Sequence, residues 1–279
     1  MKRHVKILVS VLVLSLLGML MSGCGFIARA ANGDIVLSGG TLYEVNDREK
    51  LDMEGVERVS IAGVSDEVTV QVGDEPMAVL TGQCRSIGDP VKLEVSKSGG
   101  KLTIEVKYPN NMIRSNNTNL VVTLPEGYTG NLGADTVSGS IEVAVLPLKL
   151  SEVHLNTVSG SIRFETTAFE SLEVGTISGG VVIGGIASPI RVNTVSGEIS
   201  LAYQAPADTD VVTVSGQVSA RIPKDASFQI DFGSVSGNFR SNHSGIKVSK
   251  AGRGFSASVG DGGALIKVNT TSGGFTIDE

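Results

Sequence analysis

The sequence predicts an all-β protein: a single-stranded right-handed β-helix (β-solenoid) with about 19 residues per rung, after an N-terminal signal peptide. Two observations predict the solenoid, namely a short motif that recurs at a regular spacing and an apolar alternation on both sides of it. A third is the composition. With 35 Gly, no Trp and 4% aromatic residues, the core must consist of Val, Ile, Leu and Ala, which suit strands.

The recurring motif is Thr or Ser, then Val, Ile or Thr, then Ser-Gly. Its serines are spaced by 21, 19, 18, 19, 21 and 36 residues, and a degenerate copy at Gly252-Arg253-Gly254-Phe255 divides the last step into 16 plus 20. We interpret the Ser-Gly pairs as structural repeat residues: Ser138 and Gly139, Ser159 and Gly160, Ser178 and Gly179, Ser196 and Gly197, Ser215 and Gly216, Ser236 and Gly237, Ser272 and Gly273.

The residues two and four positions before each motif, and two and four positions after its Gly, are apolar except for Thr209 and Ser241. Since strand side chains alternate between faces, each rung is expected to have two strands joined by a Ser-Gly corner, with the apolar positions inward. Leu155, Val174, Val192 and Val211 should then form one stacked inward column. The outward positions between them are polar and mixed in sign: His154, Glu173, Arg191, Asp210, Asp231 and Lys267.

Backbone geometry and hydrogen bonding explain the residue types expected at the corner. A glycine suits a position with positive φ or with a close approach of another backbone. The motif hydroxyls are expected to bond one another along the corner, with the motif Thr either inward or in the bend itself.

The chain divides into segments of different regularity. Residues 131–279 are the regular solenoid with Ser-Gly repeats. Residues 46–130 also alternate like strands, as in Val68–Val72, and are expected to form irregular rungs that cap the N-terminal end; a separate small β domain is the alternative. Residues 24–45 are expected to tether the domain to a membrane.

The N-terminus has the anatomy of an export signal: a basic start, an apolar run at residues 7–21, and small residues before Cys24. The stretch Met21-Ser22-Gly23-Cys24 resembles the lipobox of bacterial lipoproteins, which implies a lipoprotein signal peptide over 1–23 and lipidation of Cys24. Cleavage after Ala28-Arg29-Ala30 and retention of the run as an uncleaved anchor are the alternatives. Cys84 then has no disulfide partner and is expected to be a small buried residue.

Composition and spacing exclude several kinds of site. A net charge of -6 from scattered acids excludes nucleic acid as a partner. His154 and His243 lie in different rungs, so no zinc site or other cofactor is expected. The motif serines recur seven times, whereas a catalytic serine is singular. One acidic pair, Asp210 and Asp231, is expected in adjacent rungs about 5 Å apart; it is the candidate for a cation or an acid/base pair, unless both acids are merely solvated.

The seven motifs and the strand end at Leu124-Pro125 resemble the putative-adhesin family of bacterial domains of unknown function, over residues 55 to 279. The resemblance implies a β-solenoid that follows an export signal. We therefore expect a lipid-anchored protein of the cell membrane or cell surface, an adhesin-like binding or structural module and not an enzyme. Its expected partners are the membrane, through the lipid, and an envelope protein, a cell-wall polymer or another copy of itself. An envelope polysaccharide-acting enzyme on a β-helix scaffold is the alternative.

Overall fold

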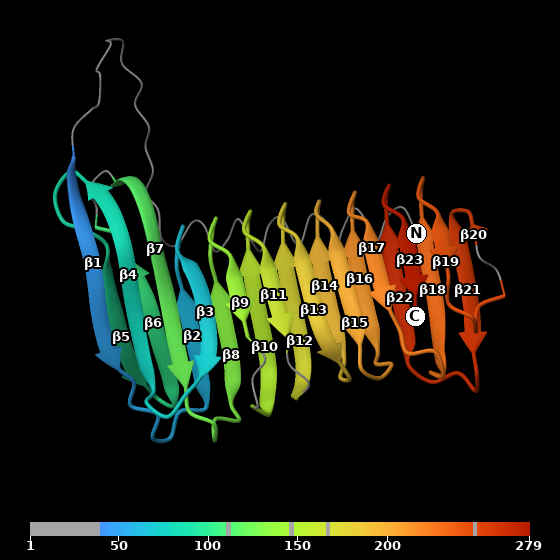
Figure 1. Cartoon of the computed structure of the whole chain (residues 1–279), viewed down its shortest axis with the longest axis horizontal. Coiled ribbons are helices and arrows are strands. Elements are labelled where there is room, and N and C mark those ends of the chain that lie inside the picture. Colours follow the sequence, from blue (N-terminus) through green and yellow to red (C-terminus); the bar gives the residue numbers. More distant parts are fainter. Residues whose placement is uncertain (1–39, 110–112, 145–147, 166–167, 248–249) are drawn as a thin grey trace, which may run out of the picture. The chain divides into compact units, whose positions relative to one another are not determined.

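The computed structural model of the chain describes residues 40–109, 113–144, 148–165, 168–247 and 250–279. Residues Thr41–Glu279 form one compact unit. Within the described ranges every regular element is a strand, and the strands belong to two sheets (Figure 1). The predicted all-β solenoid is confirmed.

Sheet A has 12 strands among the described residues. In spatial order they are β1 (Thr41–Lys50), β4 (Met77–Ser86), β7 (Ile113–Leu124), β3 (Glu67–Val72), β9 (Ile141–Val143), β11 (Ile162–Glu165), β13 (Val181–Ile186), β15 (Ile199–Tyr203), β17 (Val218–Arg221), β23 (Phe275–Asp278), β19 (Phe239–Ser241) and β20 (Lys250–Ala251).

Sheet B has 11 strands in the same described part of the chain. In spatial order they are β5 (Lys92–Ser98), β6 (Lys101–Lys107), β2 (Arg58–Ala62), β8 (Asn131–Asp135), β10 (Leu150–Thr157), β12 (Phe169–Thr176), β14 (Ile190–Thr194), β16 (Thr209–Thr213), β22 (Leu265–Thr270), β18 (Phe228–Ser234) and β21 (Gly254–Val259).

A regular rung is one strand of sheet B, a Ser-Gly corner and one strand of sheet A. Between β8 and β17 the rungs follow one another in chain order and pair in parallel. Leu155 pairs with Val174, Val174 with Val192, and Val192 with Val211. All four are fully buried, so the predicted inward column is confirmed.

One hydrophobic core lies between the sheets. It is aliphatic over most of the rungs and aromatic at the C-terminal end, where the ring centroids of Phe232, Phe239 and Phe275 are 5.7 to 6.2 Å apart. Phe255 stacks on Phe239 at 4.2 Å. The larger side chains fill the core of the last rungs, beside the antiparallel strand β21.

The C-terminal end departs from chain order. Strands β22 and β23 insert between the β16–β17 rung and the β18–β19 rung. The segment predicted as a degenerate rung, Gly252 to Phe255, lies instead where β20 and β21 run antiparallel to β19 and β18. That prediction was wrong because the chain turns back after β19. Gly260, Gly262 and Gly263, with φ of 60°, 81° and 121°, then lead it into β22.

The N-terminal end departs in a similar way. Strands β2 and β3 lie between β8–β9 and the later strands β6 and β7, while β1, β4 and β7 are antiparallel neighbours. Because β1 begins at Thr41, the last five residues of the segment predicted as a tether belong to sheet A. The other residues of that segment, apart from Gly40, lie outside the described ranges.

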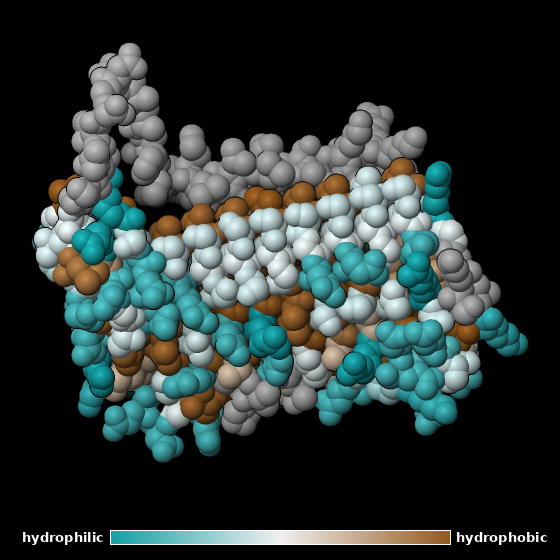
Figure 2. Space-filling model, turned by 45° about the horizontal axis from the view of Figure 1, so that its top comes forward, coloured by the Kyte–Doolittle hydropathy of each residue, from teal (hydrophilic) through white to brown (hydrophobic). Residues whose placement is uncertain are grey.

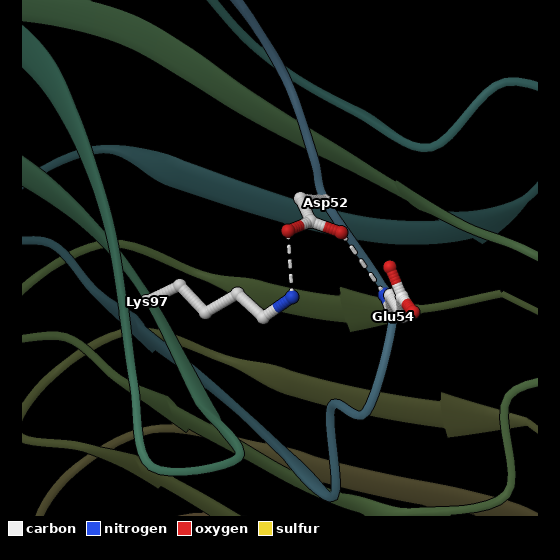
Figure 3. A network of polar contacts seen from close by, with 3 residues as sticks. All are labelled: Asp52, Glu54 and Lys97. Atoms are coloured by element: carbon white, nitrogen blue, oxygen red, sulfur yellow. Dashed lines mark hydrogen bonds and ion pairs between the residues drawn. The ribbon is translucent and has the colours of Figure 1, made fainter.

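Ionic contacts hold edge strand β5 at this end. The Lys97 ammonium is 2.6 Å from the Asp52 carboxylate, which also accepts the backbone N–H of Glu54 at 3.1 Å (Figure 3). The hydrogen bond from Lys97 lowers the pKa of Asp52. Asp47 of β1 accepts the N–H of Leu93 at 2.9 Å. Charged side chains on an edge strand also disfavour pairing with other chains.

Candidate functional site

A column of alternating charge crosses the outer face of sheet B. Strand register places one outward residue of each strand beside the next: His154 beside Glu173, Glu173 beside Arg191, Arg191 beside Asp210, Asp210 beside Lys267, and Lys267 beside Asp231. We call these six residues the charge ladder. They were predicted as outward polar positions, and the structure shows that the signs of the five from Glu173 to Asp231 alternate from strand to strand; His154 extends the alternation when it is protonated.

The ladder side chains interact loosely and remain exposed. His154 Nδ1 is 3.4 Å from a Glu173 oxygen, and Arg191 Nε is 3.8 Å from an Asp210 oxygen. Exposed fractions of these four side chains run from 43 to 61%. Pairs of this kind contribute about 0 to 1 kcal/mol to stability. The charges are therefore available to a partner at little cost to the fold.

A shallow hollow of about 530 Å³ lies over the ladder. Besides five ladder residues, its lining includes the carboxylates of Glu152 and Asp208 and the apolar side chains of Pro189 and Leu265. Polar groups of both signs around a small apolar floor suit a partner that carries both charge and apolar surface.

The acidic pair considered for a cation or for catalysis is not a pair. Lys267 lies between Asp210 and Asp231, because β22 inserts between β16 and β18. The two acids are thus two strands apart, about 9.6 Å at the usual strand spacing. Within the described ranges no group of three or more His, Cys, Asp or Glu could hold a metal ion. The predicted adjacency was wrong because it assumed that chain order equals spatial order.

The Ser-Gly corners stack into a second column. The motif Thr or Ser of every corner is buried, so this residue faces inward. In five corners its hydroxyl accepts the N–H of its own motif Gly, at 2.6 to 3.1 Å. Among the described residues, the first hydroxyls of successive motifs bond each other at one place, between Thr136 and Thr157, 3.0 Å apart. In the same two corners the hydroxyl of Ser161, just after its motif Gly, donates to that of Ser140 at 3.0 Å.

Close backbone approach explains the motif glycines. A Cβ on any of the seven would overlap a carbonyl oxygen of the neighbouring corner, as with Gly179 against Gly160. Gly197 alone among the seven has a positive φ, 146°. Each motif Ser is outward or at the bend, and in six corners its hydroxyl donates to a neighbouring corner's carbonyl at 3.3 to 3.5 Å.

An eighth corner, Gly63-Val64-Ser65-Asp66, was missed by the sequence analysis. Strand register aligns Ile61 with Ala134 and Val68 with Ile141, so Asp66 occupies the position of a motif Gly. The sequence signal that could have identified this corner is the Val-Ser pair, followed by apolar residues at the same spacing as after the other motifs.

Asp66 is fully buried and its carboxylate accepts four hydrogen bonds. The donors are the N–H of Val64 at 3.2 Å, Tyr108 Oη at 2.7 Å, Asn116 Nδ2 at 2.9 Å and the hydroxyl of Thr118. Burial, and then the charge of Asp66, raise the pKa of Tyr108. The Asp66 carboxylate is thus fully hydrogen-bonded, whereas Asn116 Oδ1 is buried without a partner among the described residues; the cluster lies at the end of the corner column.

Two predicted features concern the cysteines. Cys24, predicted to carry lipid, lies outside the described residues. Cys84 is free and fully buried. Among the described residues no helix is long and apolar enough to cross a membrane.

The chain resembles one family model and several solved structures. A model of the family described as Toastrack DUF4097 matches residues 56–189 and again residues 145–278. A putative cell adhesion protein from Clostridium sporogenes ATCC 15579 is 10% identical, over 85% of this chain and 99% of that chain, with a TM-score of 0.37. A putative adhesin from Bacteroides fragilis NCTC 9343 is 11% identical, over 85% and 96%, with a TM-score of 0.43. No curated protein matches the chain significantly.

Proposed function

Since the chain belongs to the Toastrack DUF4097 family, we propose that it is an adhesin-like binding module of the cell envelope that performs no chemistry of its own. The observation that carries the proposal is the charge ladder. A ladder repeats similar contacts across many rungs, which suits extended recognition rather than reaction at a single atom.

The polysaccharide-acting alternative makes a different demand on the ladder. A glycosidase needs two carboxyl groups flanking the scissile bond, and Asp210 and Asp231 lie two strands apart with Lys267 between them. Alternating charges instead favour a partner whose own charges alternate, an envelope protein or a cell-wall polymer. Replacement of both acids by Asn removes two ladder charges and should therefore weaken binding to envelope extract several-fold.

Charge reversal tests the ladder directly. The variant Arg191→Glu with Lys267→Glu should bind envelope extract at least tenfold more weakly, since like charges would then adjoin along the face. The matched control is Arg163→Glu with Arg221→Glu on the outer face of sheet A, which makes the same change in net charge. Equal loss in both variants would show that net charge, and not the ladder, governs binding.

We further propose that the protein is exported and anchored through lipid on Cys24, and that residues 24–39 form the tether. Two acyl chains would give stable attachment where one gives marginal attachment. Metabolic labelling with a fatty-acid analogue should label the parent chain and the control Cys84→Ala, and should not label Cys24→Ser. Equal labelling of Cys24→Ser would refute the lipid site.

A further inference from the structure

An aliphatic line runs along the corner edge of the solenoid. The second residue of each corner points outward, and Figure 2 shows these side chains as a row of hydrophobic residues beside a paler band. We call this row the corner ridge. In spatial order its members are Val64, Val137, Val158, Ile177, Val195, Val214, Thr271 and Val235.

The fold needs the backbone of the ridge residues but not their apolar side chains. The N–H of Val158 donates to the carbonyl of Val137 at 3.1 Å, and the N–H of Ile177 donates to that of Val158 at 3.2 Å. Any residue except Pro supplies those groups. The ends of the ridge, Val64 and Val235, are 36% and 47% exposed. The six residues between them are half-buried, and one of these, Thr271, is polar. A contiguous row of partly exposed apolar side chains, unlike scattered apolar residues, favours an interaction surface.

Little charge surrounds the ridge. The motif serines lie directly beside it, and the next outward row on the sheet A side contains just two acids, Glu67 and Glu198. The other members of that row are uncharged: Ser140, Ser161, Gly180, Gln217, Gly274 and Asn238. A partner that covers the ridge therefore desolvates few charges, which would otherwise oppose binding.

We propose that a second copy of this chain packs on the corner ridge, with the two solenoids antiparallel. The main reason is spacing. Ridge side chains repeat at the strand spacing of about 4.8 Å, so a partner fills the gaps along the whole ridge when its own apolar groups repeat at that spacing. A second copy satisfies this condition by construction, and a two-fold axis closes the contact as a dimer.

The area that the contact would bury and the distribution of charge along the ridge both agree with a second copy of the chain as the partner. Eight corners span about 34 Å, and a band about 15 Å wide gives roughly 500 Å² per copy, or about 1,000 Å² in total, the lower bound for a specific interface. Glu67 and Glu142 lie near one end of the ridge, with one cation, Arg163, beside Glu142, and Arg240 lies near the other end. The antiparallel arrangement brings these opposite charges together, whereas a parallel one brings like charges together. The inference does not rest on the charge ladder.

Cross-linking in membranes that contain the full-length chain tests both contact and direction. Val137 is second and Thr271 seventh along the ridge, about 24 Å apart within one chain, beyond the reach of a short bis-maleimide. In the antiparallel dimer each lies opposite the other of the second copy. The double variant Val137→Cys with Thr271→Cys should therefore give a covalent dimer, and each single variant should give none above the parent chain.

Other results contradict the proposal. A dimer from Val137→Cys alone would indicate parallel packing. Absence of dimer from the double variant would show that no second copy covers the ridge. A cross-link from the ridge to residues 1–39 of the same chain would show that this segment covers it instead.

A second measurement uses co-purification of differently tagged copies. The variant Ile177→Asp with Val195→Asp places four acids at the centre of the contact and should reduce co-purification at least tenfold. The control Ser171→Asp with Gln229→Asp adds the same charge on sheet B and should co-purify as the parent does. Both should keep the parent's melting temperature; equal co-purification of all three chains would overturn the proposal.

Discussion

The corner at Thr176–Gly179 and the corner at Gly63–Asp66 both join a strand of sheet B to a strand of sheet A. They differ in that the glycine and the side chain that accepts a backbone N–H have exchanged positions. In the first, the inward hydroxyl of Thr176 accepts the N–H of Gly179, and the bare Gly179 admits the carbonyl of Gly160. In the second, Gly63 stands at the Thr position and the side chain stands at the Gly position, where Asp66 accepts the N–H of Val64.

The direction of stacking explains the exchange. A Cβ added to any motif Gly would point at the corner before it in spatial order. A Cβ on Gly139 would point at Asp66. Among the described residues, what lies beyond Asp66 is strand β7, with Asn116 and Thr118. A side chain is therefore excluded at the seven stacked corners and permitted at the one that ends the column.

The largest expected effect comes from placing a side chain at a stacked corner. In Gly179→Ala the new methyl group would overlap the carbonyl of Gly160, so adjacent rungs must separate and lose several hydrogen bonds. We expect a loss of at least about 4 kcal/mol in the free energy of unfolding, seen as loss of cooperative thermal unfolding. The control is Gly127→Ala, where a Cβ has no neighbour within 4 Å. Melting of Gly179→Ala within a few degrees of the control would disprove the packing argument.

A smaller effect is expected at the terminal corner. Asp66→Asn keeps the shape of the side chain but replaces one accepting oxygen by a donor. That donor faces either the N–H of Val64 and the hydroxyl of Tyr108, or the amide of Asn116 and the hydroxyl of Thr118. Loss of buried hydrogen bonds to a carboxylate should cost about 2 to 3 kcal/mol, measured by urea unfolding. Asp66→Gly would show whether glycine, which stands at this position in the other corners, can replace Asp66 without loss of stability. If Asp66→Asn were as stable as the parent chain, the carboxylate would not be what ends the column.

Replacing the hydroxyl in a stacked corner should cost less still. Thr176→Val is nearly isosteric and leaves the buried N–H of Gly179 without its acceptor, a loss of about 1 to 2 kcal/mol. The control is Thr69→Val on the outward side of β3, where the side chain is half-buried. An equal change in the two variants would assign the effect to β propensity rather than to the corner.

The two corners also show what the sequence can and cannot predict. Alternation with a period of two reports the side on which a residue lies, so the inward position of Val192 was predictable, as was the need for Gly179. The Gly63–Asp66 corner was missed because its glycine stands where the motif has Thr.

Neighbour relations were beyond the sequence for a different reason. Spacing identifies a corner but not the corner that stacks on it, since a chain that turns back can insert a later strand between two earlier ones. Strand β22 does so, and Lys267 thereby separates Asp210 from Asp231. The outward position of each ladder residue was predictable, whereas the alternation of sign along the ladder depends on this insertion.

The smallest expected effect is at the charge ladder. Arg191 lies between Glu173 and Asp210, and its side chain is 61% exposed, with Nε 3.8 Å from an Asp210 oxygen. Because water screens such a pair, Arg191→Gln should change the free energy of unfolding by no more than about 0.5 kcal/mol. The same variant should weaken binding to envelope extract several-fold, and increasingly so at low salt, where surface charges act over longer distances. A loss of more than about 2 kcal/mol in stability would place the ladder among the groups that hold the fold together, and the reason for assigning it to a partner would then disappear.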